Sequence, residues 1–237
     1  MKKKLTSIIL LMAPLYIIHA GGCKKAEATG NSCKVSSVTE PGYSPANISY
    51  RADGKIDKIT REDELRTFTY NGNTTTILIT SDGIFSSRKI LTYNADGMVV
   101  NMRNHYNESG TEWYNDVYEY NGRQITRRTS TDSYGPGAEV NTYIWVNENI
   151  ANETITQAGT IVYEYYTDKE YQPGDYHYVN QMLNDSYQVI FNKNLLKNYK
   201  VNNNSPVNYS YSFDNAGKII SITREGRSPV TLTHQCN

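Results

Sequence analysis

Apolar and polar residues alternate along most of the chain with a period of two, the spacing of a β-strand that buries one face. The clearest case is VNYSYSF, residues 207–213, in which Tyr209 and Tyr211 share one face with valine and phenylalanine while asparagine and serine take the other. No segment keeps an apolar spacing of 3.6 residues. The best helical rival, residues 189–200, is interrupted by three asparagines, which disfavour a helix. The pattern therefore predicts an all-β protein.

A thirteen-residue phrase occurs twice, as YRADGKIDKITRE at residues 50–62 and as FDNAGKIISITRE at residues 213–225, with seven positions identical. Each copy joins an aromatic residue, a polar turn with glycine and a new apolar run, which is typical of a β-hairpin because glycine supplies a left-handed backbone. Variants of the unit begin at Tyr70, Tyr93, Tyr106 and Tyr120, and a copy without glycine begins at Trp145. Most starts are 20 to 27 residues apart, which indicates an array of similar hairpins.

Turn residues divide the chain between residues 46 and 235 into about 14–17 short strands. We therefore expect an antiparallel meander that forms a large curved sheet or a barrel-like structure. Two longer loops, residues 131–139 and residues 167–176, interrupt this meander.

The strand that leaves the repeated turn has an irregular apolar pattern. Ile56 and Ile59 are three residues apart, as are Ile219 and Ile222, so each pair faces opposite sides of a regular strand. This spacing indicates either a β-bulge or a strand that is partly covered on both faces.

The first residues have the order of a secretory signal. Three lysines precede an apolar run, and small residues follow it. The run is shorter than the roughly 20 residues that a membrane-spanning helix needs, so a retained membrane anchor is the weaker alternative. Ala20-Gly-Gly-Cys23 then resembles the lipobox of bacterial lipoproteins, although alanine stands where the family usually has a larger aliphatic residue. The resemblance implies cleavage before Cys23 and a lipid on its thiol; a secreted protein with a free Cys23 is the alternative.

These features give an expected organisation of the chain. Residues 1–22 form a signal peptide, residues 23–45 a lipid-anchored tether, and residues 46–237 a single all-β domain. Lys24 and Lys25 begin the tether without an acidic run of the kind associated with surface export, which favours the periplasm.

The chain has three cysteines, an odd number for an oxidising compartment. If Cys23 carries a lipid, Cys33 and Cys236 remain as a pair. A disulfide between them would join the two ends of the domain, and closing a loop of about 200 residues stabilises a fold by roughly 5 kcal/mol in the chain-entropy description. The alternative is two buried free thiols.

The unit of aromatic residue, turn and glycine resembles the YD repeats of RHS-type proteins. Together with the lipobox, residues 46–225 resemble a family of lipoproteins of unknown function from gut anaerobes that have a porin-like β-fold. The resemblance implies a large curved or barrel-like sheet and a cell-envelope location, lipid-anchored to the outer membrane on its periplasmic or surface face. It implies no catalytic residues.

Charge and composition narrow the choice of partners. Removal of residues 1–22 takes away three of the 24 basic side chains and none of the 24 acidic ones, so the mature chain is close to neutral. A nucleic-acid partner would call for a strongly basic face, and the nearly neutral charge does not suggest one, so we expect no nucleic-acid partner. We expect contact with the membrane through the N-terminal lipid only. Tyrosine outnumbers phenylalanine by 21 to four, which suits sheet faces that are only half dry.

The sequence offers little for catalysis. His105, His177 and His234 lie far apart, and no Cys-x-x-Cys pair or nucleophile motif is present, so we expect no metal site, no cofactor and no enzyme activity. Asp168 and Asp175 lie in or near the second long loop and could serve a hydrolase or a calcium site. Acids in a polar loop are common without a function, so the hydrolase is the lesser alternative.

Aromatic residues on the strands carry the better functional signal, because aromatic faces beside planar polar groups bind sugars. The candidate stacking residues are Trp113, Tyr118, Tyr163, Tyr165, Tyr209 and Tyr211. They equally suit an envelope protein partner, or cross-strand pairs that only stabilise the sheet. We therefore expect a non-catalytic, lipid-anchored envelope protein with a binding or structural role, and a glycan-binding accessory lipoprotein as the leading alternative.

Overall fold

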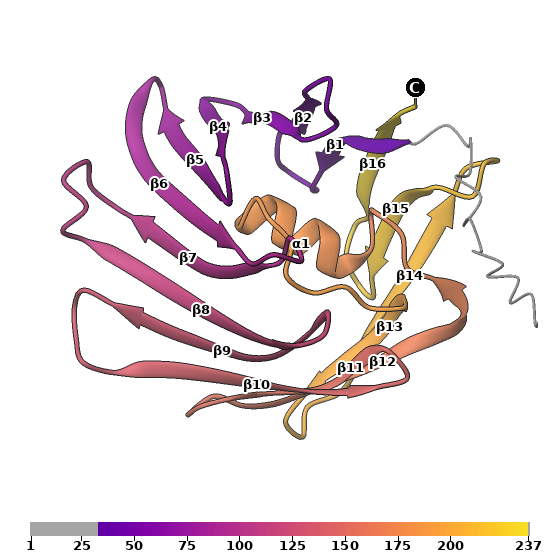
Figure 1. Ribbon diagram of the computed structural model, residues 1–237. Helices are drawn as coiled ribbons and strands as arrows, with labels where there is room; N and C mark the ends of the chain where they lie inside the picture. Colours follow the sequence, from indigo (N-terminus) through magenta and orange to yellow (C-terminus); the bar gives the residue numbers. More distant parts are fainter. Residues whose placement is uncertain (1–32, 237) are drawn as a thin grey trace, which may run out of the picture. The chain divides into compact units, whose positions relative to one another are not determined.

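The computed structural model describes residues 33–236, which form sixteen β-strands and one short helix (Figure 1). The strands are β1 (Lys34–Thr39), β2 (Ala46–Tyr50), β3 (Ile56–Arg61), β4 (Glu64–Asn71), β5 (Thr74–Ser81), β6 (Ile84–Tyr93), β7 (Val99–His105), β8 (Trp113–Asn121), β9 (Gln124–Asp132), β10 (Ala138–Val146), β11 (Asn149–Ile155), β12 (Gly159–Glu170), β13 (Asn194–Val201), β14 (Val207–Phe213), β15 (Ile219–Arg224) and β16 (Val230–Gln235). The helix α1 spans Tyr176–Asn184. No helix within residues 33–236 has both the length and the apolar content to cross a membrane. The predicted class and the strand number are confirmed.

The sheet closes on itself. Every strand pairs antiparallel with its sequence neighbours, and β1 pairs with both β2 and β16, so the meander becomes a barrel. At this seam the expected disulfide joins Cys33, before β1, to Cys236, after β16. The strand β1 lies in the stretch that the sequence assigned to the tether, so the barrel already begins at Lys34. The lipidation candidate Cys23 and the signal peptide lie outside the described residues.

Alternation along each strand decides what faces the lumen of the barrel. On β5, for example, Thr75, Ile77 and Ile79 are buried, whereas Thr74 and Thr76 face outward. The buried side chains of all the strands meet in one apolar core that includes Val35, Phe68, Leu91, Met102, Ile125, Ile150, Leu196, Ile219 and Leu232. The core therefore lies inside the barrel and not between two sheets.

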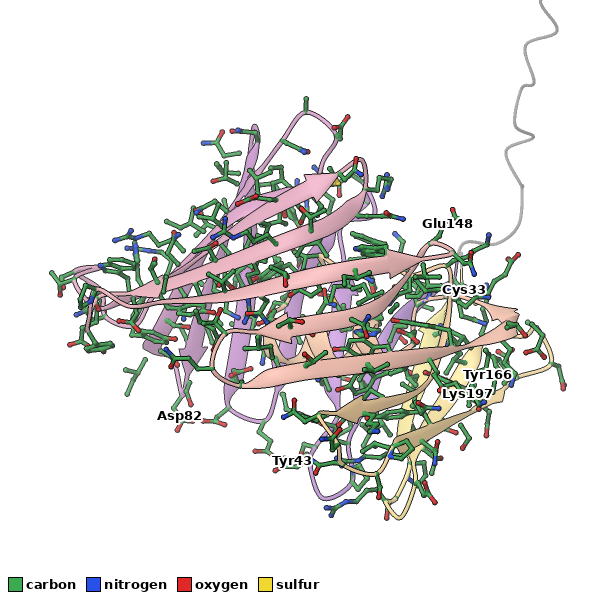
Figure 2. The ribbon with its side chains drawn as sticks, turned by 90° about the horizontal axis from the view of Figure 1, so that it is seen from below. Cys33, Tyr43, Asp82, Glu148, Tyr166 and Lys197 are labelled. Atoms are coloured by element: carbon green, nitrogen blue, oxygen red, sulfur yellow. A yellow bond between two sulfur atoms is a disulfide. The ribbon has the colours of Figure 1, made fainter. Side chains whose placement is uncertain are left out.

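The turns lie at two opposite ends of the barrel. We call the end that carries Cys33 and Cys236 the terminal end, and the other the distal end. Because each unit of the repeat contains two strands, the turns after β2, β4, β6, β8, β10 and β14 all lie at the terminal end. In Figure 2 Cys33 and Glu148 of the β10–β11 turn lie toward one end of the barrel, and Tyr43 and Asp82 lie toward the other, at the distal turns.

The repeated phrase places a bulge beside its aromatic residue. The pairing register shifts by one residue next to Tyr50 and next to Phe213, so the irregular isoleucine spacing reflects a β-bulge. The same shift occurs beside Tyr93, Tyr120 and Trp145. In the two complete copies the turn glycines Gly54 and Gly217 have φ of 84° and 75°, a backbone that favours glycine.

The aromatic residue of a unit also bonds to the unit before it. The hydroxyl of Tyr70 donates to the carbonyl of Ile56 at 2.8 Å, and the hydroxyl of Tyr120 donates to the carbonyl of Val99 at 2.7 Å. Tyr50 and Trp145 make the same kind of bond, to Val35 and Ile125. Burial raises the pKa of Tyr70 to about 12, so its hydroxyl keeps its proton at neutral pH. We call these contacts the aromatic links.

The connection between β12 and β13 folds into the lumen, where strands surround α1 (Figure 1). We call residues 171–193 the plug. The sequence predicts a loop at residues 167–176 and no helix, and α1 corrects this prediction. The buried face of the helix contains the polar side chains of His177 and Gln181 beside Val179 and Met182. Because polar and apolar residues are mixed on this face, the apolar residues alone do not show a helical period. The helical rival at residues 189–200 mostly forms strand β13.

The wall of the barrel holds the plug at both ends of α1. At its start, the buried carboxylate of Asp175 accepts hydrogen bonds from the backbone N–H groups of His177 and Leu196. At its end, the guanidinium of Arg66 and the ammonium of Lys89 donate to the last helical carbonyls and those just beyond. A carboxylate at the N-terminus and cations at the C-terminus both complement the helix dipole.

Candidate functional site

The candidate stacking residues lie in three different surroundings. Trp113 is on the outer wall, where the guanidinium of Arg103 stacks over its ring at 4.1 Å. Tyr118 and Tyr163 project into the lumen, and each donates its hydroxyl to a carboxylate, that of Asp116 or Glu153. These three side chains are far from forming one strip.

The remaining candidates come from β12 and β14. Tyr165 is half-buried, and its hydroxyl has no hydrogen-bond partner among the described residues. Tyr211 donates its hydroxyl to Asp175 at 3.2 Å, so it helps to hold the plug. Tyr209 is different, because it lines a groove at the distal end of the barrel.

This groove has a volume of about 740 Å³. It lies between α1 on one side and the ends of β13 to β16 on the other, and the loop of residues 40–45, which carries Tyr43, forms its rim. Figure 2 shows the side chain of Tyr43 projecting from a distal turn. We call it the distal groove. Its volume lies in the range of small-molecule sites.

Three tyrosines from separate elements meet in the distal groove. Tyr176 comes from α1, Tyr199 from β13 and Tyr209 from β14. The ring centres of Tyr176 and Tyr209 are 4.7 Å apart, and Tyr199 lies 6.0 Å from each of the others. We call these residues the tyrosine cluster. The rings of Tyr176 and Tyr199 are only partly buried, so the groove offers an aromatic surface to a ligand.

Planar polar groups stand beside the tyrosine cluster. Asn180 and Asn184 follow Tyr176 at intervals of four residues, which places all three on one stripe of α1. The amide nitrogen of Asn184 donates to the amide oxygen of Asn180 at 3.3 Å. On the opposite wall, Arg224 of β15 and Arg227 of the β15–β16 turn line the groove, and both are exposed.

A second cavity lies inside the lumen, between the plug and the wall. It has a volume of about 230 Å³ and is lined by charged and aromatic residues of β8 to β12. Asp116 accepts hydrogen bonds from Tyr118 and Ser130 and lies 3.9 Å from the guanidinium of Arg128. Glu153 accepts from Asn141 and Tyr163. These two carboxylates are therefore engaged by the barrel itself.

His177 borders the lumen cavity from the plug. Its ring lies 5.4 Å from that of Tyr163, and its Nε2 has no hydrogen-bond partner among the described residues. Burial lowers the pKa of His177, although the charges of Asp175 and Glu153 oppose the shift. The imidazole is therefore neutral at neutral pH.

The acids considered for a hydrolase do not converge. Asp168 is exposed on β12, whereas Asp175 is fully buried and uses its carboxylate to hold α1, Leu196 and Tyr211. Within residues 33–236 no cluster of three or more histidine, cysteine, aspartate or glutamate side chains has the arrangement of a metal site.

Six groove residues of this site were not predicted from the sequence: Tyr176, Asn180, Asn184, Tyr199, Arg224 and Arg227. Tyr199 and Arg224 lie on strands, but only the register shows that they face the lumen beside Tyr209. Tyr176 and Asn180 lie on the unpredicted helix. The one available signal was the repeated phrase, since Arg224 is part of its second copy.

Comparison with known proteins shows the fold and nothing finer. The sequence matches no protein-family profile and no curated protein. The structure is similar to a crystal structure of a porin-like protein from Bacteroides uniformis, with a TM-score of 0.59 at 14% identity, covering 86% of this chain and 95% of that one. It is equally similar to a porin-like protein from Bacteroides vulgatus, with a TM-score of 0.59 at 15% identity, covering 84% and 97%. The chain therefore shares a closed antiparallel barrel with these porin-like proteins.

Proposed function

We propose that this protein is a non-catalytic, lipid-anchored binding protein of the bacterial cell envelope, and that its distal groove binds a carbohydrate. The proposal joins the N-terminal sequence, which resembles a lipoprotein signal, to the one feature of the barrel that suits a ligand. That feature is the tyrosine cluster with amide and guanidinium groups at its edge. Aromatic faces and planar polar groups together suit the apolar faces and the hydroxyls of a sugar ring.

The outer wall of the barrel supports a location in water. A membrane-spanning barrel turns apolar side chains outward in a band about 25 Å tall and keeps polar ones inside. Here the outward positions are largely polar, including Thr67, Thr69, Thr74, Thr76, Arg88, Asn101, Asn115, Arg127, Thr129, Lys200, Asn208, Ser210 and Thr233. Outward apolar residues do not form a continuous band around the barrel; Ile144 of β10 and Val162 of β12, for example, are separated by Asn152 of β11. We infer that the lipid, and not the barrel, holds the protein at the membrane.

The plug supports binding over conduction. It lies across the lumen and contacts the wall from Arg66 of β4 to Tyr211 of β14. A side chain of β8, Tyr118, shares a hydrogen bond of 2.7 Å with Tyr187 of the plug. A lumen that is occupied and hydrogen-bonded in this way suits a rigid support for a site at its mouth.

The lipid would also orient the groove. Cys33 lies at the terminal end, only ten residues after Cys23, so a lipid on Cys23 holds the terminal end toward the membrane. The distal groove is at the opposite end of the barrel. It therefore faces away from the anchoring bilayer, toward a soluble or cell-wall ligand.

The experiment uses residues 24–237, produced without the lipid and purified without detergent, on a glycan array followed by isothermal titration calorimetry. Trp113 and Trp145 lie outside the distal groove, so their fluorescence is a poor reporter of binding. We expect a single saturable site that Tyr199→Ala weakens at least fivefold, by analogy with the stacking of a nucleic-acid base on an aromatic side chain, which contributes about 1–3 kcal/mol.

Tyr106→Ala is the matched control, because Tyr106 is an exposed tyrosine of the β7–β8 turn outside the groove. An array without any hit would overturn the carbohydrate proposal and favour a protein partner. A requirement for detergent in solution would contradict the proposed water-facing wall.

A further inference from the structure

We propose that the distal groove selects an acidic carbohydrate, one that carries a carboxylate on its ring, and that Arg224 and Arg227 bind this carboxylate. The inference rests on the proposed function, because it uses the same groove and the same tyrosine cluster. It adds the charge of the ligand and the residues that recognise it.

The first observation is that two guanidinium groups are free. Neither Arg224 nor Arg227 makes an ion pair, a side-chain hydrogen bond or a stacking contact with another of residues 33–236. Each of the remaining arginines in that range has at least one such contact: Arg51, Arg61, Arg66, Arg88, Arg103, Arg123, Arg127 and Arg128. The two exceptions both line the distal groove.

The second observation is their placement beside the tyrosine cluster. Arg224 lies directly across from Tyr209 in the β14–β15 pairing, so both side chains project to the same face of the sheet. Burial raises the pKa of Tyr209, and the charge of Arg224 acts against that shift, which reflects their proximity. A ligand ring that contacts the tyrosine cluster therefore has a guanidinium within reach of its substituents.

A tight turn brings the second arginine to the same rim. The N–H of Arg227 donates to the carbonyl of Arg224 at 2.9 Å, and Gly226 between them has a φ of 71°. Residues at the first and last positions of a β-turn lie within about 7 Å of each other at their Cα atoms. The two guanidinium groups therefore belong to one short, fixed segment.

The third observation is the charge balance of the groove. Glu40 is the one acidic residue among those that line it, and its carboxylate already accepts from Arg61 at 2.7 Å. Arg61 occupies in the first copy of the repeated phrase the position that Arg224 occupies in the second. The fold thus supplies a carboxylate for the first of these equivalent arginines and none for the second.

These observations together indicate the class of ligand. A guanidinium binds a carboxylate through two parallel N–H···O bonds, and such charge-assisted pairs are roughly twice as strong as neutral hydrogen bonds. A uronic acid offers that carboxylate on a pyranose ring whose face can stack on tyrosine. The amides of Asn180 and Asn184 remain for its hydroxyls.

The test compares three probes on residues 24–237 by isothermal titration calorimetry: trigalacturonic acid, its methyl ester and the neutral galactotriose of the same linkage. We expect the ester and the neutral sugar to bind at least tenfold more weakly than the acid. Arg224→Gln and Arg227→Gln should each weaken binding of the acid at least fivefold more than they weaken binding of galactotriose, so that the difference between the probes shrinks. Raising the salt concentration should weaken the binding of trigalacturonic acid and leave the binding of the two uncharged probes unchanged, because the arginine–carboxylate contact is exposed to solvent.

Arg127→Gln is the matched control, since Arg127 lies on the outer wall in an exposed pair with Glu119, and it should change nothing. Equal binding of the three probes, lost on Tyr199→Ala, would overturn the acidic selectivity and keep the carbohydrate function. If Tyr199→Ala left the affinity for the acid unchanged, both the acidic selectivity and the carbohydrate function would be overturned, because the site would then be a simple anion site. Failure of all three probes and of the whole array would also overturn both.

Discussion

Asp175 makes the most connections of any carboxylate in the plug. It is fully buried, it caps the N-terminus of α1 through the N–H of His177, and it also accepts from Leu196 of β13 and Tyr211 of β14. The Asp175 side chain thus caps the helix and also binds the start of the helix to two strands of the wall. A buried carboxylate with three donors is favourable only while all three remain in place.

We predict that Asp175→Ala lowers the free energy of unfolding by about 2–4 kcal/mol, because it removes a helix cap and leaves buried donors without an acceptor. Urea denaturation followed by circular dichroism measures the loss. The control is Asp168→Ala, an exposed aspartate on β12, for which we expect a change within about 0.5 kcal/mol. Similar losses for both variants would show that Asp175 does not hold the plug.

His177 gives the protein a dependence on pH. Burial lowers its pKa below the ordinary value of 6.5, so the folded state keeps the imidazole neutral while the unfolded state takes up a proton. Stability is then full above pH 6.5 and falls as the pH drops below it, since the unfolded state binds more protons. We predict that His177→Phe flattens this dependence between pH 7 and pH 5.

The measurement is the free energy of unfolding of both proteins at several pH values, and the difference between them isolates His177 from other titrating groups. The pKa of His105 is also lowered, by burial and then by the charges of Arg88 and Arg103, so His105 should contribute to the pH dependence that remains in His177→Phe. Parallel curves for the parent protein and His177→Phe would contradict the prediction.

At the scale of the elements, the aromatic links give three tyrosines, Tyr50, Tyr70 and Tyr120, a structural role in joining hairpins. Each link reaches from the end of one hairpin to a backbone carbonyl of the hairpin before it, so the contact repeats at the terminal end of the barrel. At Tyr50, Tyr120 and Trp145 a neighbouring bulge frees backbone groups from regular pairing, and bulges are common at the rims of barrels. The repeat is therefore a structural device for joining consecutive hairpins.

We predict that Tyr70→Phe and Tyr120→Phe each lower the free energy of unfolding by about 1 kcal/mol, because each loses one buried hydrogen bond while keeping its ring. The double variant should lose the sum, since the two links belong to different hairpins. Chemical denaturation of the four proteins checks this. Tyr106→Phe, on an exposed tyrosine, should be neutral, and an equal effect there would rule out a specific role for the links.

At the scale of the whole molecule, closure of the barrel depends on its seam. The strands β1 and β16 pair over five positions, whereas β1 and β2 pair over only two. The disulfide between Cys33 and Cys236 joins residues that are 203 positions apart, and it lies directly beside this seam. It therefore restricts the unfolded chain and also holds the first strand in place.

We predict that replacing both cysteines by serine lowers the free energy of unfolding by about 2–5 kcal/mol, mainly through the greater freedom of the unfolded chain. Hydrogen exchange should show the largest loss of protection in β1 and β16. Cys33→Ser alone should cost the same as the double variant. Dithiothreitol should reproduce the loss in the parent protein and leave the double variant unchanged, and an effect on the double variant would point to another cause.

Local sequence carried enough information to predict the class, the number of strands and the disulfide. Alternation of apolar and polar residues predicts a strand that buries one face, whichever strands pair with it. The turn residues mark where each strand ends. The repeated phrase likewise predicts its hairpins, because each copy contains a turn glycine after an aromatic residue. The choice between a bulge and a doubly covered strand needed the pairing register, because both give the same isoleucine spacing.

The helix and the site were decided by tertiary structure. The apolar spacing does not mark α1, because its buried face includes His177 and Gln181, and the N-cap Asp175 is the local signal for this helix. The two polar side chains are favourable there because the lumen surrounds them. The distal groove likewise needs Tyr176, Tyr199 and Tyr209 from three elements. The sequence by itself determined the strands, since their pattern is periodic and local. Closure of the barrel decided which tyrosines meet and which arginines stay unpaired, because those contacts join residues far apart in the chain.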